Sequence, residues 1–295
     1  MSETPPDVAA PMVQAFFNEP TNTVSYVVAD PRSRHCAVID SVLDYDSVSG
    51  RTATRAADEI VDFIAARNLT TQWILETHIH ADHLSAAPYL QTRLGGTLGI
   101  GEHIRKVQDI FGTLFKAGTE FQRDGSQFGH LFADAEDFQL GGIQAQVLHT
   151  PGHTPACVSY VIGDAAFIGD TLFMPDSGTA RADFPGGDAR QLYRSLRRIL
   201  ALPPATRLFL CHDYKAPGRD EYRWETTVLR ESCDNIHVRD GVTEAEFVQL
   251  RTARDATLGM PRLILPAVQV NMRAGVMPPP EADGKRYLKI PIDQF

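Results

Sequence analysis

The sequence predicts a layered α/β domain, and two observations lead to this fold class. Short apolar segments with the β-branched character of strands recur along the chain, and segments with helical spacing lie between them. Strands interleaved with helices favour sheets that are covered by helices. The 295 residues, 43% of them hydrophobic, are enough to bury a large core in one domain or two.

In the first half of the chain, residues 23–30 and 35–41 are β-branched runs divided by a polar turn, which is typical of a hairpin. An amphipathic helix that ends near Asn68 is predicted by apolar residues spaced i, i+3, i+4 and i+7, namely Ala57, Ile60, Val61 and Ile64. A strand, a helix and a short strand are then expected at 73–75, 85–94 and 97–101. Residues 102–137 show no clear period.

The second half begins with three expected strands, at residues 143–150, 157–164 and 165–170. A helical stripe follows, made of Leu192, Leu196, Ile199 and Leu200, and then a strand at 207–212. The sequence TEAE at 243–246 has the spacing of a capping box and predicts a helix that runs to about Leu258. The proline-rich end predicts an extended arm.

Composition limits the partners and the compartment. The 28 Lys and Arg residues against 37 Asp and Glu give a net charge of −9 without a basic run, so we expect neither a nucleic acid nor an anionic membrane as partner. No signal-like or long apolar segment is evident, which favours the cytoplasm. The cysteines form no CxxC pair and are expected to be buried thiols rather than disulfides: Cys36, Cys157, Cys211 and Cys233.

Residues 76–87, ETHIHADHLSAA, concentrate imidazole and carboxylate groups at the end of an expected strand. His78 and His80 lie on the same side of an extended chain, and a turn brings Asp82 and His83 round to face them. Other candidates follow separate apolar runs, so all of them could converge at one sheet edge: His153, Asp170 and His212. A hydrogen-bonded surface network is the alternative to a metal site.

Imidazole together with carboxylate suits zinc, iron or manganese, and the absence of clustered thiolates argues against a structural four-cysteine zinc site. Gly152 and Gly169 precede two of the candidate ligands and fit tight turns. Cys211 is adjacent to His212, and because neighbours on a strand point to opposite faces we expect it to pack in the core instead of serving as a nucleophile.

The motifs HIHADH, PGHT and GD, followed by a late histidine after a strand, resemble the metallo-β-lactamase superfamily. This resemblance implies an αβ/βα sandwich with the metals at one edge between two sheets. We accordingly expect a flexible tail at 1–12, the catalytic domain at 13–215, and a small helical and extended C-terminal extension at 216–295 that packs on it. In dinuclear members one metal uses the equivalents of His78, His80 and His153, the other those of Asp82, His83 and His212, and Asp170 bridges them.

Three further stretches resemble the persulfide dioxygenases, in a bacterial form: SGTARADF at 177–184, CHDYKAPG at 211–218 and VQVNMRAGV at 268–276. The resemblance implies oxidation of glutathione persulfide by dioxygen to glutathione and sulfite at one ferrous iron per chain. Zinc is redox-inert and suits hydrolysis, whereas two histidines and one carboxylate leave open positions on iron. The implied iron ligands are His78, His153 and Asp170, with His80, Asp82, His83 and His212 around them or at a second metal.

Glutathione carries two carboxylates, so cationic donors are expected near the metal. The candidates are Arg181, Tyr214, Lys215 and Arg273, each with a surface charge or a structural ion pair as the alternative role. Two other functions stay open, a glyoxalase-II-like hydrolase of glutathione thioesters and a non-catalytic metal-binding or sensor module. Association into a homo-oligomer is also open.

Overall fold

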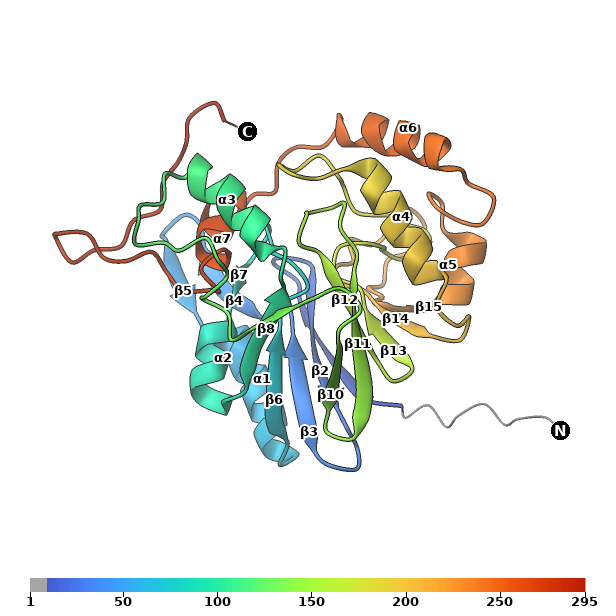
Figure 1. Ribbon diagram of the computed structural model, residues 1–295, viewed down its shortest axis with the longest axis horizontal. Coiled ribbons are helices and arrows are strands. Elements are labelled where there is room, and N and C mark those ends of the chain that lie inside the picture. Colours follow the sequence, from blue (N-terminus) through green and yellow to red (C-terminus); the bar gives the residue numbers. More distant parts are fainter. Residues whose placement is uncertain (1–9, 295) are drawn as a thin grey trace.

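The computed structural model describes residues 10–294 and shows two face-to-face sheets with helices on their outer faces (Figure 1). The first sheet has the order β1 (Met12–Asn18), β2 (Thr23–Ala29), β3 (His35–Ile39), β6 (Thr70–Leu75), β8 (Thr97–Gly101) and β9 (His130–Phe132). The helices α1 (Arg55–Ala66), α2 (Ala87–Leu94) and α3 (Ile104–Leu114) belong to the same half of the chain. The predicted αβ/βα sandwich is confirmed.

The second sheet follows in the order β10 (Asp137–Leu140), β11 (Ile143–His149), β12 (Val158–Ile162), β13 (Ala165–Phe167), β14 (Arg207–Phe209) and β15 (Glu225–Thr227). Three helices accompany it, α4 (Ala189–Leu200), α5 (Val228–Asp234) and α6 (Glu244–Asp255). A small sheet contains β5 (Arg51–Ala53), β4 (Val42–Asp46) and β7 (Leu84–Ser85), and α7 (Ile264–Asn271) packs against β7.

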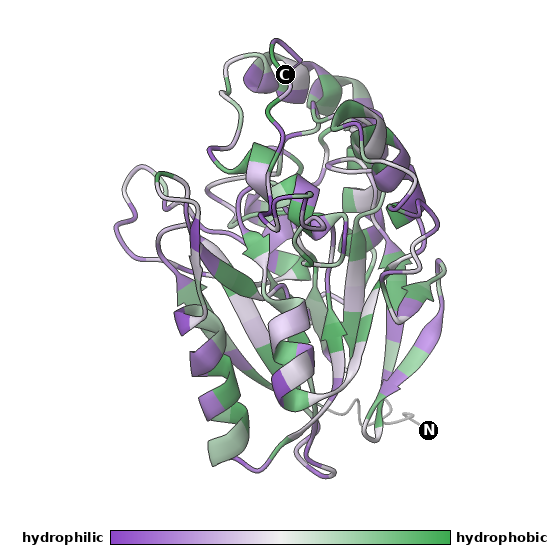
Figure 2. Cartoon of the chain, turned by 90° about the vertical axis from the view of Figure 1, so that its left-hand side faces the viewer, coloured by the Kyte–Doolittle hydropathy of each residue, from purple (hydrophilic) through white to green (hydrophobic). Residues whose placement is uncertain are grey.

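The core between the two sheets is rich in aromatic side chains. Tyr26, Phe132 and Tyr160 are fully buried there and contact Phe138 or Phe167 through ring edges and tilted faces. Figure 2 shows that hydrophobic residues gather on the strands, whereas the outward sides of the helices are hydrophilic. Because both sheets bury one face in this core, the ends of their strands meet at one rim of the sandwich.

Several expectations about individual elements are corrected. Residues 102–137, which show no clear period, contain α3 and β9. The expected extended arm contains α7, in which Pro266 occupies the first turn, where a missing backbone N–H removes no helical hydrogen bond. Cys233 is exposed, whereas the other three cysteines are buried as expected.

The ends of the predicted units differ in part from the observed elements. Most of the tail expected at 1–12 lies outside the described residues, and β1 already begins at Met12. The second sheet extends past residue 215 to β15, and the capping box at Thr243 begins α6, which packs on α4. Within residues 10–294, no helix is both long and apolar enough to cross a membrane.

Glu231 makes stability depend on pH. Its carboxyl is fully buried in α5, one oxygen accepts a hydrogen bond from Asn235 at 2.7 Å, and burial raises its pKa to about 8. Because the folded chain keeps a proton that the unfolded chain releases near pH 4.5, the free energy of unfolding should fall between pH 4.5 and 8, by roughly 1.4 kcal/mol per pH unit. Glu231→Gln should remove this slope, as measured by chemical denaturation across that range.

The matched control is Glu59→Gln, which changes an exposed carboxylate on α1 and should keep the wild-type slope. An equally steep slope in Glu231→Gln would assign the pH dependence to other groups.

Candidate metal centre

The candidate ligands lie at one rim because each follows a strand. His78 and His80 come after β6, His153 after β11, Asp170 after β13 and His212 after β14. All five side chains are buried. The predicted convergence of these residues is therefore present in the structure, with β6 contributed by the first sheet and the other three strands by the second.

Three of these residues form a compact set of ligand atoms. The Nε2 atoms of His78 and His153 lie 3.8 and 3.7 Å from the same carboxylate oxygen, Oδ2 of Asp170. These separations are too long for hydrogen bonds, but they fit a metal held about 2.1 Å from each atom. Nε2 of His78 is fully buried and has no hydrogen-bond partner among the described residues, so the donor set fits a bound metal.

Hydrogen bonds from the opposite ring atoms orient both histidines. Nδ1 of His78 lies 2.9 Å from the Thr77 hydroxyl, and Nδ1 of His153 lies 2.8 Å from the backbone oxygen of Arg181. Burial lowers the pKa of both imidazoles, well below the usual value for His78. Neutral imidazoles with their Nε2 lone pairs directed at one point are the form that binds a metal.

His212 links two carboxylates. Its Nδ1 lies 2.6 Å from Oδ1 of Asp170 and its Nε2 lies 2.5 Å from Oδ2 of Asp82. Burial opposes protonation, but the two carboxylates raise the pKa of His212 well above its usual value, so the imidazolium donates to both. Burial likewise opposes ionisation of Asp170, yet His212 lowers the pKa of that carboxyl.

His80 is held in the same way by carboxylates absent from the sequence-based set. Its Nε2 lies 3.0 Å from Oδ1 of Asp40 and 3.2 Å from Oε2 of Glu76. Burial alone would lower the pKa of His80, but Asp40 raises it well above the usual value. By contrast, burial lowers the pKa of His83 to about 4. The ligand atoms of His80, Asp82 and His83 lie within 4.8 Å of one another, which marks a second place where a cation could sit.

Asp40 and the two glycines build the backbone around these groups. Asp40 has a φ of 52°, and its carboxylate accepts hydrogen bonds from the backbone N–H and the hydroxyl of Thr77. Gly169 also has a positive φ, and a Cβ there would meet the Thr77 hydroxyl at 2.5 Å. At Gly152 a Cβ would meet the α4 backbone at 2.3 Å. As expected, both glycines allow tight turns, and Gly152 serves packing against α4.

Asn271 in α7 fixes the histidine loop from the C-terminal side. Its Nδ2 donates to the backbone oxygens of His80 and His83, at 2.9 and 2.8 Å, and its Oδ1 accepts from Ser85 N at 2.8 Å. The sequence-based set did not include Asn271, but the residue begins the NMRAG motif, which is the sequence feature that could have identified it.

Cys211 corrects another expectation. Its sulfur, the Asp170 carboxylate and the His212 ring lie within 4.8 Å of one another, so the side chain faces the metal centre and not only the core. We expected the Cys211 side chain to point away from His212 because side chains alternate along a strand. That expectation fails because β14 ends at Phe209, so residues 211 and 212 are not on a regular strand. Burial raises the pKa of the Cys211 thiol.

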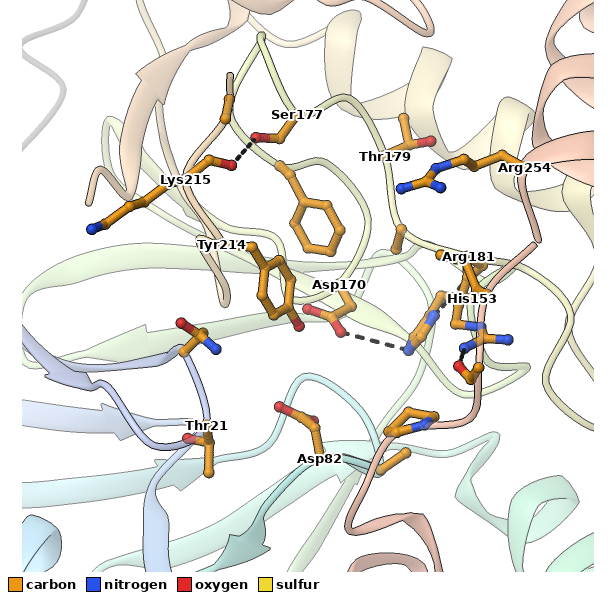
Figure 3. A pocket seen from close by; sticks show the side chains of 18 of the residues that line it. Thr21, Asp82, His153, Asp170, Ser177, Thr179, Arg181, Tyr214, Lys215 and Arg254 are labelled. Carbon is orange, nitrogen blue, oxygen red and sulfur yellow. Dashed lines mark hydrogen bonds and ion pairs between the residues drawn. The ribbon is translucent and has the colours of Figure 1, made fainter. Parts of the chain in front are cut away.

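A cavity of about 720 Å³ opens over the triad, with His153 and Asp170 in its wall (Figure 3). Tyr214 and Lys215 line it as expected, and the Tyr214 hydroxyl points toward the space between Asp170 and Asp82. The Tyr214 ring is parallel to that of His212, with centroids 5.8 Å apart.

The two arginine expectations change. Arg181 lines the cavity, but its guanidinium donates to both oxygens of Asp183 and to the Gly259 carbonyl, so it is held in a structural ion pair. Arg273 does not line the cavity, because its guanidinium lies over the Phe121 ring, 4.3 Å from the centroid. Two exposed cations that the sequence-based set lacks do line it, Arg254 and Arg262.

Residues 19–212 match the family model described as metallo-beta-lactamase superfamily. The chain belongs to the metallo-β-lactamase superfamily. It is 57% identical to a probable metallo-hydrolase of Burkholderia pseudomallei, over 95% of this chain and 99% of that protein. It is 46% identical to glyoxylase B2 of Dictyostelium discoideum, over 95% and 97% of the two chains.

A more distant relative is the mitochondrial persulfide dioxygenase ETHE1 of Bos taurus, with 30% identity over 91% of each chain. The crystal structure of ETHE1 from Myxococcus xanthus covers 90% of this chain and 99% of its own, with 28% identity and a TM-score of 0.71. These matches confirm the predicted superfamily and the resemblance to persulfide dioxygenases. The chain spans 66% of the β-lactamase hydrolase-like protein of Xylella fastidiosa that it also resembles.

Asn271→Asp tests the contact between α7 and the histidine loop. The carboxylate still accepts from Ser85 N but no longer donates to the carbonyls of His80 and His83, and it repels them. We expect metal affinity to fall about 10- to 100-fold, as for other groups that orient ligands. The affinity is measured by competition with a chelator. Glu59→Gln on α1 is the distant control. A metal affinity of Asn271→Asp equal to that of the unsubstituted protein would show that this contact does not affect metal binding.

Proposed function

We propose that the chain is a persulfide dioxygenase with one ferrous iron, which converts glutathione persulfide, dioxygen and one water to glutathione, sulfite and two protons. The observation that carries this proposal is that only some of the buried ionisable side chains are free to bind a metal. His78, His153 and Asp170 present three atoms to one point, while the ring nitrogens of His212 are both engaged by carboxylates. Two imidazoles and one carboxylate form the ligand set of many non-haem iron oxygenases.

Bound iron would supply redox chemistry and open coordination positions for dioxygen and the substrate. The residues of the chain prepare the site for it. The Thr77 hydroxyl and the Arg181 carbonyl fix the rings of His78 and His153, and the His212 Nδ1–H holds one oxygen of Asp170 so that the other faces the histidines. Phe173 and Phe184 give the cavity apolar surface, and the Phe184 ring lies 5.1 Å from that of His153.

The cavity also offers charges for the glutathione part of the substrate. Arg254 has one long hydrogen bond, 3.4 Å to Thr257, and Arg262 has no hydrogen bond or ion pair among residues 10–294. Lys215 lies beside the Tyr222 ring and forms no ion pair within the described part of the chain. We propose that Arg254 and Arg262, with Lys215, bind the two carboxylates, in place of the engaged Arg181 and the distant Arg273.

A glyoxalase-II-like thioester hydrolase is the second candidate, and specific observations favour it. Nδ1 of His80 and Nε2 of His83 are buried without hydrogen-bond partners among the described residues, as ligands of a second metal would be. The similar proteins named metallo-hydrolase and glyoxylase B2 have higher identity than ETHE1. The engagement of His212 by Asp170 and Asp82 favours the single-metal function. Cytoplasmic location and homo-oligomer formation stay predictions.

Ligand substitutions distinguish the two functions. Asp170→Ala or His78→Ala should remove both iron and turnover, whereas Asp82→Ala or His212→Ala should keep iron and lower activity about 10- to 100-fold. The measurements are metal analysis of anaerobically purified protein and oxygen uptake on adding glutathione persulfide. Two metals bound by the residues of this centre, with zinc-supported thioester cleavage and no oxygen uptake, would show the hydrolase instead.

Arg254→Ala tests substrate binding. Loss of a charge-assisted hydrogen bond in this partly exposed cavity should cost about 1–2 kcal/mol and raise KM roughly five- to thirtyfold, with kcat and iron content nearly unchanged. Arg230→Ala is the matched control, since Arg230 is exposed on α5 and does not line the cavity. A KM equal to that of the control would exclude Arg254 from substrate binding.

A further inference from the structure

A second group of metal-ligand side chains lies outside the catalytic centre and is here named the rim cluster: Glu102, His103 and His149. One ligand atom from each residue lies within 4.8 Å of the others. The rings of His103 and His149 meet at 68° with their centroids 4.6 Å apart. Two imidazoles with one carboxylate suit zinc and neighbouring divalent transition metals.

The rim cluster connects the two sheets. Glu102 and His103 follow β8 of the first sheet, whereas His149 is the last residue of β11 in the second. The two strand ends approach closely, because a Cβ on Gly101 would meet the Val158 side chain at 2.5 Å and His149 Nε2 at 3.8 Å. A cation at this point would join the sheets.

The backbone that carries the rim cluster is anchored by its own hydrogen bonds. The Glu102 backbone N–H donates to Phe132 O at 2.8 Å, and that of His149 donates to Asp134 Oδ1 at 2.8 Å. The His149 carbonyl accepts from Arg198 at 3.1 Å. The three side chains are therefore presented from fixed positions, which lowers the entropy cost of collecting them around an ion.

The side-chain atoms are largely uncommitted. The His103 ring has no hydrogen bond among the described residues. Its pKa is lowered, mainly by burial and to a smaller extent by the neighbouring His149. His149 Nε2 has one long contact, 3.4 Å to Phe132 O, and Nδ1 has no hydrogen bond within the part of the chain that the structure describes. Among residues 10–294, Glu102 forms an ion pair only with Arg105, at 3.8 Å on the surface, and such a pair contributes little to stability. A divalent ion would displace that arginine.

We propose that the rim cluster is a second metal site, which binds a zinc-class divalent cation through Glu102, His103 and His149 and ties the two sheets together. His149 precedes His153 by four residues, so the bound ion also steadies the segment that carries one ligand of the catalytic centre. The proposal is independent of the reaction at that centre. It adds one metal per chain to whatever the catalytic centre holds.

The test uses iron-loaded protein under anaerobic conditions, so that the catalytic triad is already filled. Titration with Co²⁺ followed by visible absorption, and with Zn²⁺ by calorimetry, should show one further equivalent. His103→Ala and His149→Ala should each weaken this binding by at least about 100-fold, more than the loss of a group that only orients a ligand. His103→Ala should keep its iron and its activity.

Two controls separate the competing sites. His130→Ala removes a nearby histidine that pairs with Glu136 at 2.6 Å and should leave the extra binding intact. His83→Ala removes a ligand of the possible second position in the catalytic centre and should also leave it intact. If the extra equivalent disappears in His83→Ala and persists in His103→Ala, or if no extra equivalent binds, the rim cluster is not a metal site.

Discussion

The contact of the His212 imidazole with the carboxylates of Asp170 and Asp82 is the interaction on which the rest of the metal centre depends. It joins residues that follow β13 and β14 to the histidine loop after β6, and its Nε2 also lies 3.0 Å from the hydroxyl of Thr23 in β2. In a buried site these charge-assisted contacts are strong, because little water screens them. With both nitrogens of His212 engaged, one oxygen of Asp170 stays directed at His78 and His153.

The metal centre buries many ionisable groups. It is stable only if each charge has a partner, since an unpaired buried charge is very costly. The chain meets this requirement by alternating signs: His212 lies between Asp170 and Asp82, and His80 lies between Asp40 and Glu76. Neutral His78 and His153 are left with free nitrogens. Buried backbone oxygens also need partners, and the C-terminal extension supplies them here, because Asn271 donates to the backbone oxygens of His80 and His83.

The sequence was informative where a local pattern carries the physics. Strand ends with histidine and aspartate, the stripe at Ala57–Ile64 and the capping box at Thr243 each predict structure from neighbouring residues, and each appears in the fold. Contacts between distant segments were not predictable in this way. Asp40 reaches His80 only through the sheet order, in which β3 pairs with β6, whereas Glu76 lies four residues before His80. The helix α7 forms despite the proline-rich sequence because its single proline, Pro266, lies in the first turn. The direction of Cys211 depended on where β14 ends, which alternation alone does not determine.

The corrections at Arg181 and Arg273 have a common physical cause. In the TARADF segment the guanidinium of Arg181 is fixed by Asp183 and Gly259, and the same residue's backbone oxygen then orients His153. In the NMRAG segment Asn271 clamps the histidine loop, while Arg273 lies over Phe121 in the long stretch between β8 and β10. Both motifs support the metal ligands. Under the proposed function, binding of the glutathione carboxylates is therefore left to side chains outside these two motifs, and Arg254 and Arg262 line the cavity where such binding would not disturb the metal centre.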